Sequence, residues 1–148
     1  VSDNVVHFDA ELRTRLIRQA VEEYGLRVLG EVGSKHDKTD MATLVSDIRD
    51  SIDAGAWKVF VEAAEFVTDK GLDTELIRIL LQEVDPGDIL FELPGKWIPD
   101  VHTHTVYRMM VWLIEHIGAD VNIGNVAPED VAPLETLRTG VGVNLKLT

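Results

Sequence analysis

The sequence lacks cysteine, a long apolar run and a secretion leader. With no cysteine among its 148 residues, it can form neither disulfides nor a thiolate zinc site. No apolar run approaches the roughly 20 residues that a membrane-spanning helix needs. No basic segment followed by an apolar one opens the chain, so nothing marks it for secretion. The cytoplasm is therefore the expected compartment.

Basic residues are also scarce. The chain has 14 Lys and Arg residues against 26 Asp and Glu residues, a formal net charge of -12. This balance argues against sequence-independent nucleic-acid binding, which needs a basic face to displace counterions. Solubility or a saline cytoplasm would also explain the acidity. We expect no nucleic-acid or membrane partner, and any small anionic substrate would need a local basic cluster or a metal.

Short β-rich runs alternate with amphipathic helical segments along the chain. Alternation of this kind predicts βα units and a parallel sheet. Strands are predicted at 26–32, 57–63, 89–93 and 119–126, and helices at 9–24, 41–54, 73–84, 99–117 and within 127–140. We interpret residues 1–148 as one α/β domain, the C-terminal half of a (β/α)8 TIM-type barrel.

The start of the chain suggests that strands are missing before it. It begins at Val1 with "VSDN", which is typical of a strand end whose beginning is cut away. An open half-barrel would expose two strand edges and an apolar interior. We therefore expect a fragment that pairs with its N-terminal half or with another chain, as in a homo-oligomer.

Polar side chains occupy the predicted strand ends. They are Asp3, Glu31, Glu62, Glu92 and Asn122. Barrels of this class place their active sites at the C-terminal ends of the strands. A carboxylate on an apolar strand is costly unless it is paired or binds a cation. The ring predicts a Mg²⁺ site, with Glu62, Glu92 and Asp3 as ligands; the alternative is that the acids pair with Lys or Arg.

One lysine and a pair of histidines are further candidates. Lys35 comes four residues after Glu31, and Gly33 between them allows a tight turn toward the barrel mouth. A desolvated lysine near carboxylates can donate a proton; otherwise Lys35 is a solvated loop residue. His102 and His104 lie two apart on a predicted helix, so they should face different directions and not share a metal.

Six stretches of the chain resemble phosphosulfolactate synthases, barrel enzymes that add sulfite to phosphoenolpyruvate. The stretches are "VSDN", "LRVLGEVGSK", "DAGAWKVFVEA", "ILFELP", "VNIGNV" and "LETLR". The resemblance covers the later part of that family's length. It implies a Mg²⁺-dependent carbon–sulfur lyase of coenzyme M biosynthesis, in which Lys35 protonates C2.

The resemblance also suggests roles for the other site residues. We expect Glu31 and Glu62 to act in catalysis with Lys35, and Asn122, Asn125, Arg138 and Lys96 to bind substrate. One departure is that Ala64 stands where family members carry an Arg that would clamp an anion. The alternative functions are a non-catalytic relative, similar to plant heat-stress-associated proteins of this family, and a structural module.

Overall fold

A four-stranded parallel sheet organises the chain in the computed structural model. The structure describes residues 1–2, 6, 9–34, 38–95, 98–99 and 101–141. The strand order is β1-β2-β5-β6, and every pairing in this sheet is parallel. The strands span Leu29–Val32 (β1), Lys58–Val61 (β2), Ile89–Glu92 (β5) and Ile123–Gly124 (β6). The predicted α/β class with a parallel sheet is confirmed.

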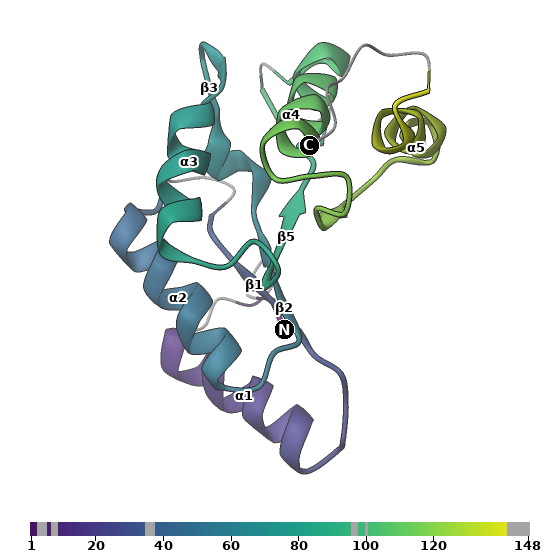
Figure 1. Ribbon diagram of the computed structural model, residues 1–148. Helices are drawn as coiled ribbons and strands as arrows, with labels where there is room; N and C mark the ends of the chain where they lie inside the picture. The colour runs from purple at the N-terminus through teal and green to yellow at the C-terminus, as the bar shows by residue number, and fades with distance from the viewer. Residues whose placement is uncertain (3–5, 7–8, 35–37, 96–97, 100, 142–148) are drawn as a thin grey trace.

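Helices follow the strands as the alternation predicted. They span Ala10–Glu22 (α1), Met41–Asp53 (α2), Thr74–Glu83 (α3), Thr103–His116 (α4) and Val131–Thr139 (α5). Helices α1, α2 and α3 lie side by side along one side of the sheet, and α4 and α5 lie next to each other, nearer β5 than β1 (Figure 1). None of the described helices is long and apolar enough to span a membrane.

Two short elements interrupt the β2-to-α3 connection. A 3-10 turn, η1, covers Ala63–Phe66, and a small antiparallel hairpin pairs β3 (Val67–Thr68) with β4 (Gly71–Leu72). No element was predicted between the strand at 57–63 and the helix at 73–84. This turn follows β2 directly, so it lies at the carboxyl end of the sheet.

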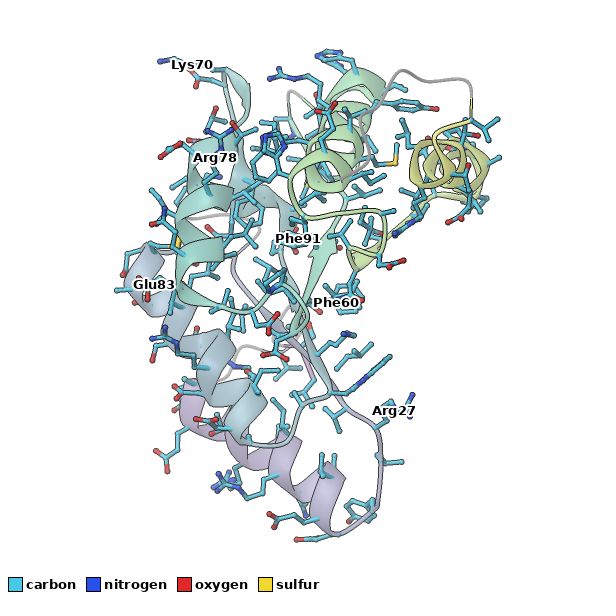
Figure 2. The ribbon with its side chains drawn as sticks, viewed as in Figure 1. Arg27, Phe60, Lys70, Arg78, Glu83 and Phe91 are labelled. Carbon is cyan, nitrogen blue, oxygen red and sulfur yellow. The ribbon has the colours of Figure 1, made fainter. Side chains whose placement is uncertain are left out.

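Alternate residues of β1, β2 and β5 are buried against the helices and form the core. Val59, Val61 and Phe91 are fully buried, and Phe91 lies 6.4 Å from Phe66 between ring centroids. The opposite residues, such as Phe60 and Leu90, are only half-buried. Phe60 extends from the sheet on the side away from α2 and α3 (Figure 2). The sheet therefore has one covered face and one open face.

Side-chain caps explain why α2 and α3 begin where they do. The Asp73 carboxylate accepts hydrogen bonds from the N–H groups of Glu75 and Leu76, at the residue where the predicted helix begins. At the start of α2, the Asp40 carboxylate likewise accepts a hydrogen bond from the backbone N–H of Thr43. These bonds satisfy N–H groups that have no partner within the helix.

Two predicted boundaries were wrong. Helix α4 begins at Thr103 and not at Pro99, because a turn with a Val101 N–H to Ile98 C=O bond precedes it. His102 therefore lies before the helix, and its ring centroid is 5.5 Å from that of His104. The two histidines lie closer together than a helical spacing of two suggested.

The last strand was also predicted too long. Strand β6 has two residues, against an expected eight from Ala119 to Val126. Residues 118–121 form a turn, in which the Val121 N–H donates to the Gly118 carbonyl. Asn125 then leaves the extended conformation with a φ of 54°.

Candidate metal and catalytic site

Three carboxylates converge at the carboxyl end of the sheet. Glu31, Glu62 and Glu92 each place a carboxylate oxygen within 4.8 Å of the others, and we call these residues the acid cluster. They come from β1, from the residue directly after β2, and from the last residue of β5. Glu62 is buried, at 2% exposure, and the other two are half-buried. Predicted strand-end acids thus meet in space.

The strand register explains this convergence. Val61 pairs with Phe91, so Glu62 and Glu92 stand at the same level, one residue further along. Glu31 pairs with Phe60 and lies two residues deeper, about 6.6 Å at the usual rise per residue. All three occupy strand positions whose side chains point toward the open face. The side chain of Glu31 is long enough to extend to the level of Glu62 and Glu92.

Close carboxylates favour a cation. At an effective dielectric constant of about 20, two unit charges 4.8 Å apart repel by about 3 kcal/mol. A divalent cation among the oxygens would offset this repulsion. Among the residues that the structure describes, this is the one group of three potential metal-binding side chains.

Gly33 sets how closely the loop after β1 approaches the acid cluster. It has a φ of +95°, a backbone conformation that favours glycine. A Cβ atom built on it would lie 3.0 Å from both the Glu62 Cβ and the Glu65 Cγ atoms. The turn that the sequence analysis predicted at Gly33 therefore also packs the chain against Glu62.

Glu65 is a functional candidate that the sequence analysis missed. Its side chain is buried in η1, at 3% exposure, and accepts hydrogen bonds from Ser34 and Thr39. The available signal was a second acid three residues after Glu62, in "VEAAEF". It lies in a turn and not in a strand, so strand-end reasoning did not reach it.

Lys38 is the described cation nearest to this turn. Its ammonium donates hydrogen bonds to the carbonyls of Ala64 and Val67. Partial burial lowers the pKa of Lys38, and the negative charges of Glu65 and Asp73 partly oppose that shift. Lys38 therefore places positive charge beside Ala64, the position where the resemblance implied an arginine.

Two predicted substrate-binding residues hold backbone segments beside β5 and β6. The Asn122 amide donates to backbone carbonyls that include those of Gly87 and Ile89, at the start of β5. Asn122 itself directly precedes β6, opposite Leu90, and so stands at the register level of Glu31, two residues before Gly124. Arg138 donates to the Ala119 and Val121 carbonyls in the turn before β6. The amide of Asn122 and the guanidinium of Arg138 thus both donate to backbone carbonyls.

Asn125 lies at the expected end. It follows β6, and its amide donates to the Leu93 carbonyl. It also lines a cavity of about 180 Å³ with Leu93, Gly95 and Asp130. Asp3, Lys35 and Lys96 lie outside the described residues, so their predicted roles stay predictions.

The fold and the cluster define the class: an α/β protein with a parallel sheet and a carboxylate site at its carboxyl edge. The family of (2R)-phospho-3-sulfolactate synthases (ComA) matches residues 1–143. The chain belongs to this family. The resemblance predicted from the residues is thereby confirmed.

Three curated relatives are each named phosphosulfolactate synthase. The protein of Methanothermobacter thermautotrophicus is 34% identical, covering 95% of this chain and 54% of its own length. The protein of Methanocaldococcus jannaschii is 31% identical, and the match covers 95% of this chain and 56% of that protein. The protein of Bacillus subtilis is 30% identical, and the match covers 77% of this chain and 45% of that protein. The chain spans about half the length of these relatives.

Proposed function

We propose that this chain supplies part of the active site of a phosphosulfolactate synthase-like lyase. The reaction is the Mg²⁺-dependent addition of sulfite to phosphoenolpyruvate or to a related small phosphorylated or carboxylated substrate. The observation that supports it most is the convergence of Glu31, Glu62 and Glu92, in a chain whose relatives are named for this activity.

The donor set fits Mg²⁺ in chemistry. Mg²⁺ is a hard cation and binds oxygen ligands, usually one or two carboxylates with water and substrate oxygens. Its bonds of about 2.0–2.1 Å allow two ligand oxygens to lie about 4.2 Å apart at most. The cluster oxygens lie within 4.8 Å of one another, so one cation could bind all three with at most a small side-chain shift. We propose Glu62 and Glu92 as ligands and Glu31 as the third carboxylate of the site.

The proposed chemistry balances without a redox partner. Sulfur of sulfite attacks C3 of phosphoenolpyruvate and forms the carbon–sulfur bond, and the double-bond electrons move to C2 and into the adjacent carboxylate. The Lys35 ammonium then gives C2 its proton. A bound Mg²⁺ supplies positive charge where the carboxylate becomes electron-rich. The residues of this chain hold the cation, orient the substrate and deliver the proton.

Substrate contacts are proposed for the carboxyl end of the sheet. Asn125 lies there beside the Leu93 carbonyl, and Lys96 follows "LPG" in the same loop region of the sequence. Asn122 and Arg138 instead bond to backbone carbonyls that fix β5 and β6. Their influence on substrate would therefore pass through the position of those strands.

The open face of the sheet supports the proposal of a partial barrel. Phe60 and Leu90 are half-buried on it, beside the acid cluster. In a closed barrel such a face is the interior, filled by layers of side chains. We propose that N-terminal strands of the same protein, or another copy of the chain, cover this face. The cytoplasmic location stays a prediction.

A non-catalytic relative is the second candidate, and Ala64 favours it. The resemblance implies an Arg at this position, which would clamp phosphate or sulfonate. Here the nearest described cation is Lys38, whose ammonium is engaged by the Ala64 and Val67 carbonyls. A protein that lacks the clamp could keep the fold and lose the chemistry.

One assay separates the two candidates. The full-length protein is incubated with phosphoenolpyruvate, sulfite and Mg²⁺, and ³¹P NMR follows conversion of the enol phosphate to an alkyl phosphate. If the protein is the lyase, we expect phosphosulfolactate to form. Excess EDTA should stop its formation, and added Mg²⁺ should restore it. Lys35→Ala should abolish turnover with the circular dichroism spectrum unchanged. A folded protein that makes no product from these substrates would favour the non-catalytic candidate.

A further inference from the structure

Glu65 ties the two described ends of one loop to the turn beside the acid cluster. Its carboxylate accepts the Ser34 N–H at 2.8 Å and the Thr39 N–H at 3.0 Å. The Thr39 hydroxyl adds a third hydrogen bond at 2.6 Å. Ser34 and Thr39 stand on either side of residues 35–37, and these include Lys35. One buried carboxylate thus holds the chain before and after the lysine.

The turn that carries Glu65 is itself fixed to this loop. Lys38 donates to the carbonyls of Ala64 and Val67, so hydrogen bonds run in both directions between loop and turn. Gly33 packs against the side chains of Glu62 and Glu65 together. The position of the loop is therefore coupled to that of Glu62, a member of the acid cluster.

Glu65 is not available as a metal ligand in this arrangement. Its two oxygens receive hydrogen bonds from Ser34 and Thr39, and the acid cluster does not include it. Hydrogen bonds to an ionised carboxylate are short and strong, so each helps to define the loop geometry. The charge of Glu65 is used to hold the backbone.

We propose that Glu65 is a positioning residue for Lys35, holding both ends of its loop against the turn that follows Glu62. This role rests on the proposed function of Lys35 as proton donor. Proton transfer requires the donor within hydrogen-bond reach of the reacting carbon, so a loosened loop lowers the rate of turnover. Binding of the substrate anion to other residues is affected less.

The test compares Glu65→Gln with Glu75→Gln in the full-length protein. Glu75 is an exposed glutamate on α3, and its substitution removes the same charge without touching the loop. A lysine-acylating reagent is applied, and mass spectrometry gives the ratio of the modification rate of Lys35 to that of exposed Lys70. We expect Glu65→Gln to change this ratio at least threefold, and Glu75→Gln to leave it unchanged.

Steady-state kinetics provide the second readout. Glu65→Gln should lower kcat at least tenfold and change the KM for phosphoenolpyruvate by less than about threefold. Thr39→Val removes the hydroxyl donor with little change of shape, so it gives a milder change of the same kind and replaces Glu65→Gln if that variant does not fold. Ile48→Val, a core change far from the loop, controls for lost stability and should alter neither readout.

The outcomes separate this inference from the proposed function. An unchanged Lys35 to Lys70 ratio overturns the positioning role, whatever the kinetics show. A shifted ratio with unchanged kcat also overturns it. If the wild-type protein lacks synthase activity, the proposed function fails, and the modification ratio still decides whether Glu65 anchors the loop.

Discussion

Replacing Gly33 with alanine should destabilise the fold and disturb the acid cluster together. A positive φ costs an L-residue about 1–2 kcal/mol. The new Cβ would lie 3.0 Å from the Glu62 Cβ and Glu65 Cγ atoms, and overpacking costs about 1–3 kcal/mol. Alanine also restricts the unfolded chain more than glycine does, which stabilises the folded state by about 0.4–1 kcal/mol. We expect a net loss of about 3 kcal/mol in the free energy of unfolding.

The contacts around Gly33 leave little room for relief. The Glu62 Cβ atom is fixed by its backbone, whose N–H donates to the Val32 carbonyl. Glu65 is held by its three hydrogen bonds from Ser34 and Thr39. Because neither can turn away, the strain should displace Glu62 and weaken Mg²⁺ binding as well as stability.

Gly25→Ala is the matched control. Gly25 has a φ of +62°, but a Cβ there would meet nothing within 4 Å. The free energy of unfolding of Gly25→Ala should fall only by the cost of the positive φ. This is about 1 kcal/mol once the reduced freedom of the unfolded chain is subtracted. Urea unfolding followed by circular dichroism measures both variants. Equal losses for Gly33→Ala and Gly25→Ala, or unaltered Mg²⁺ affinity in Gly33→Ala, would refute the reasoning.

Three further predictions concern local features. Asp73→Ala removes the N-cap of α3 and should lower the free energy of unfolding by about 1 kcal/mol, measured by urea denaturation. The hydrogen bonds from Thr43 lower the pKa of Asp40 below its ordinary value of 3.8. The ionised carboxylate therefore stabilises the folded state above pH 3.8. This stabilisation is lost as the pH falls through the lowered pKa. The stability of wild type relative to Asp40→Asn should accordingly decrease on acidification, and a pH-independent difference would exclude this account. Gly124→Ala brings a Cβ within 2.4 Å of Phe60 and Leu90, whose ends can rotate on the open face, so a smaller loss of about 1–2 kcal/mol is expected in thermal unfolding.

Periodicity and turn residues were enough to predict the sheet and its helices. Strands such as 89–93 are apolar, and helix starts such as Asp73 carry their own caps, so local sequence determines them. The end of the sheet was harder to predict, because β6 has only two residues and is defined by its pairing with β5. Asn122, predicted near the end of this strand, directly precedes the two paired residues.

The acid cluster was partly predictable, whereas its surroundings were not. Glu31, Glu62 and Glu92 stand at strand ends, and parallel strands bring their carboxyl ends together. Glu65 carries no such pattern, since its role depends on Ser34 and Thr39, which are 31 and 26 residues earlier in the chain. Contacts across that separation appear only once the turn and the loop are placed in space.

The most direct test of the account is Mg²⁺ binding to the acid cluster, measured by isothermal titration calorimetry on the full-length protein. The account predicts one Mg²⁺ per chain, a loss of affinity of at least tenfold in Glu62→Gln and Glu92→Gln, and no change in Glu83→Gln, which removes an exposed glutamate of α3. Wild-type affinity in both cluster variants, or no Mg²⁺ binding by the folded wild-type protein, would contradict it.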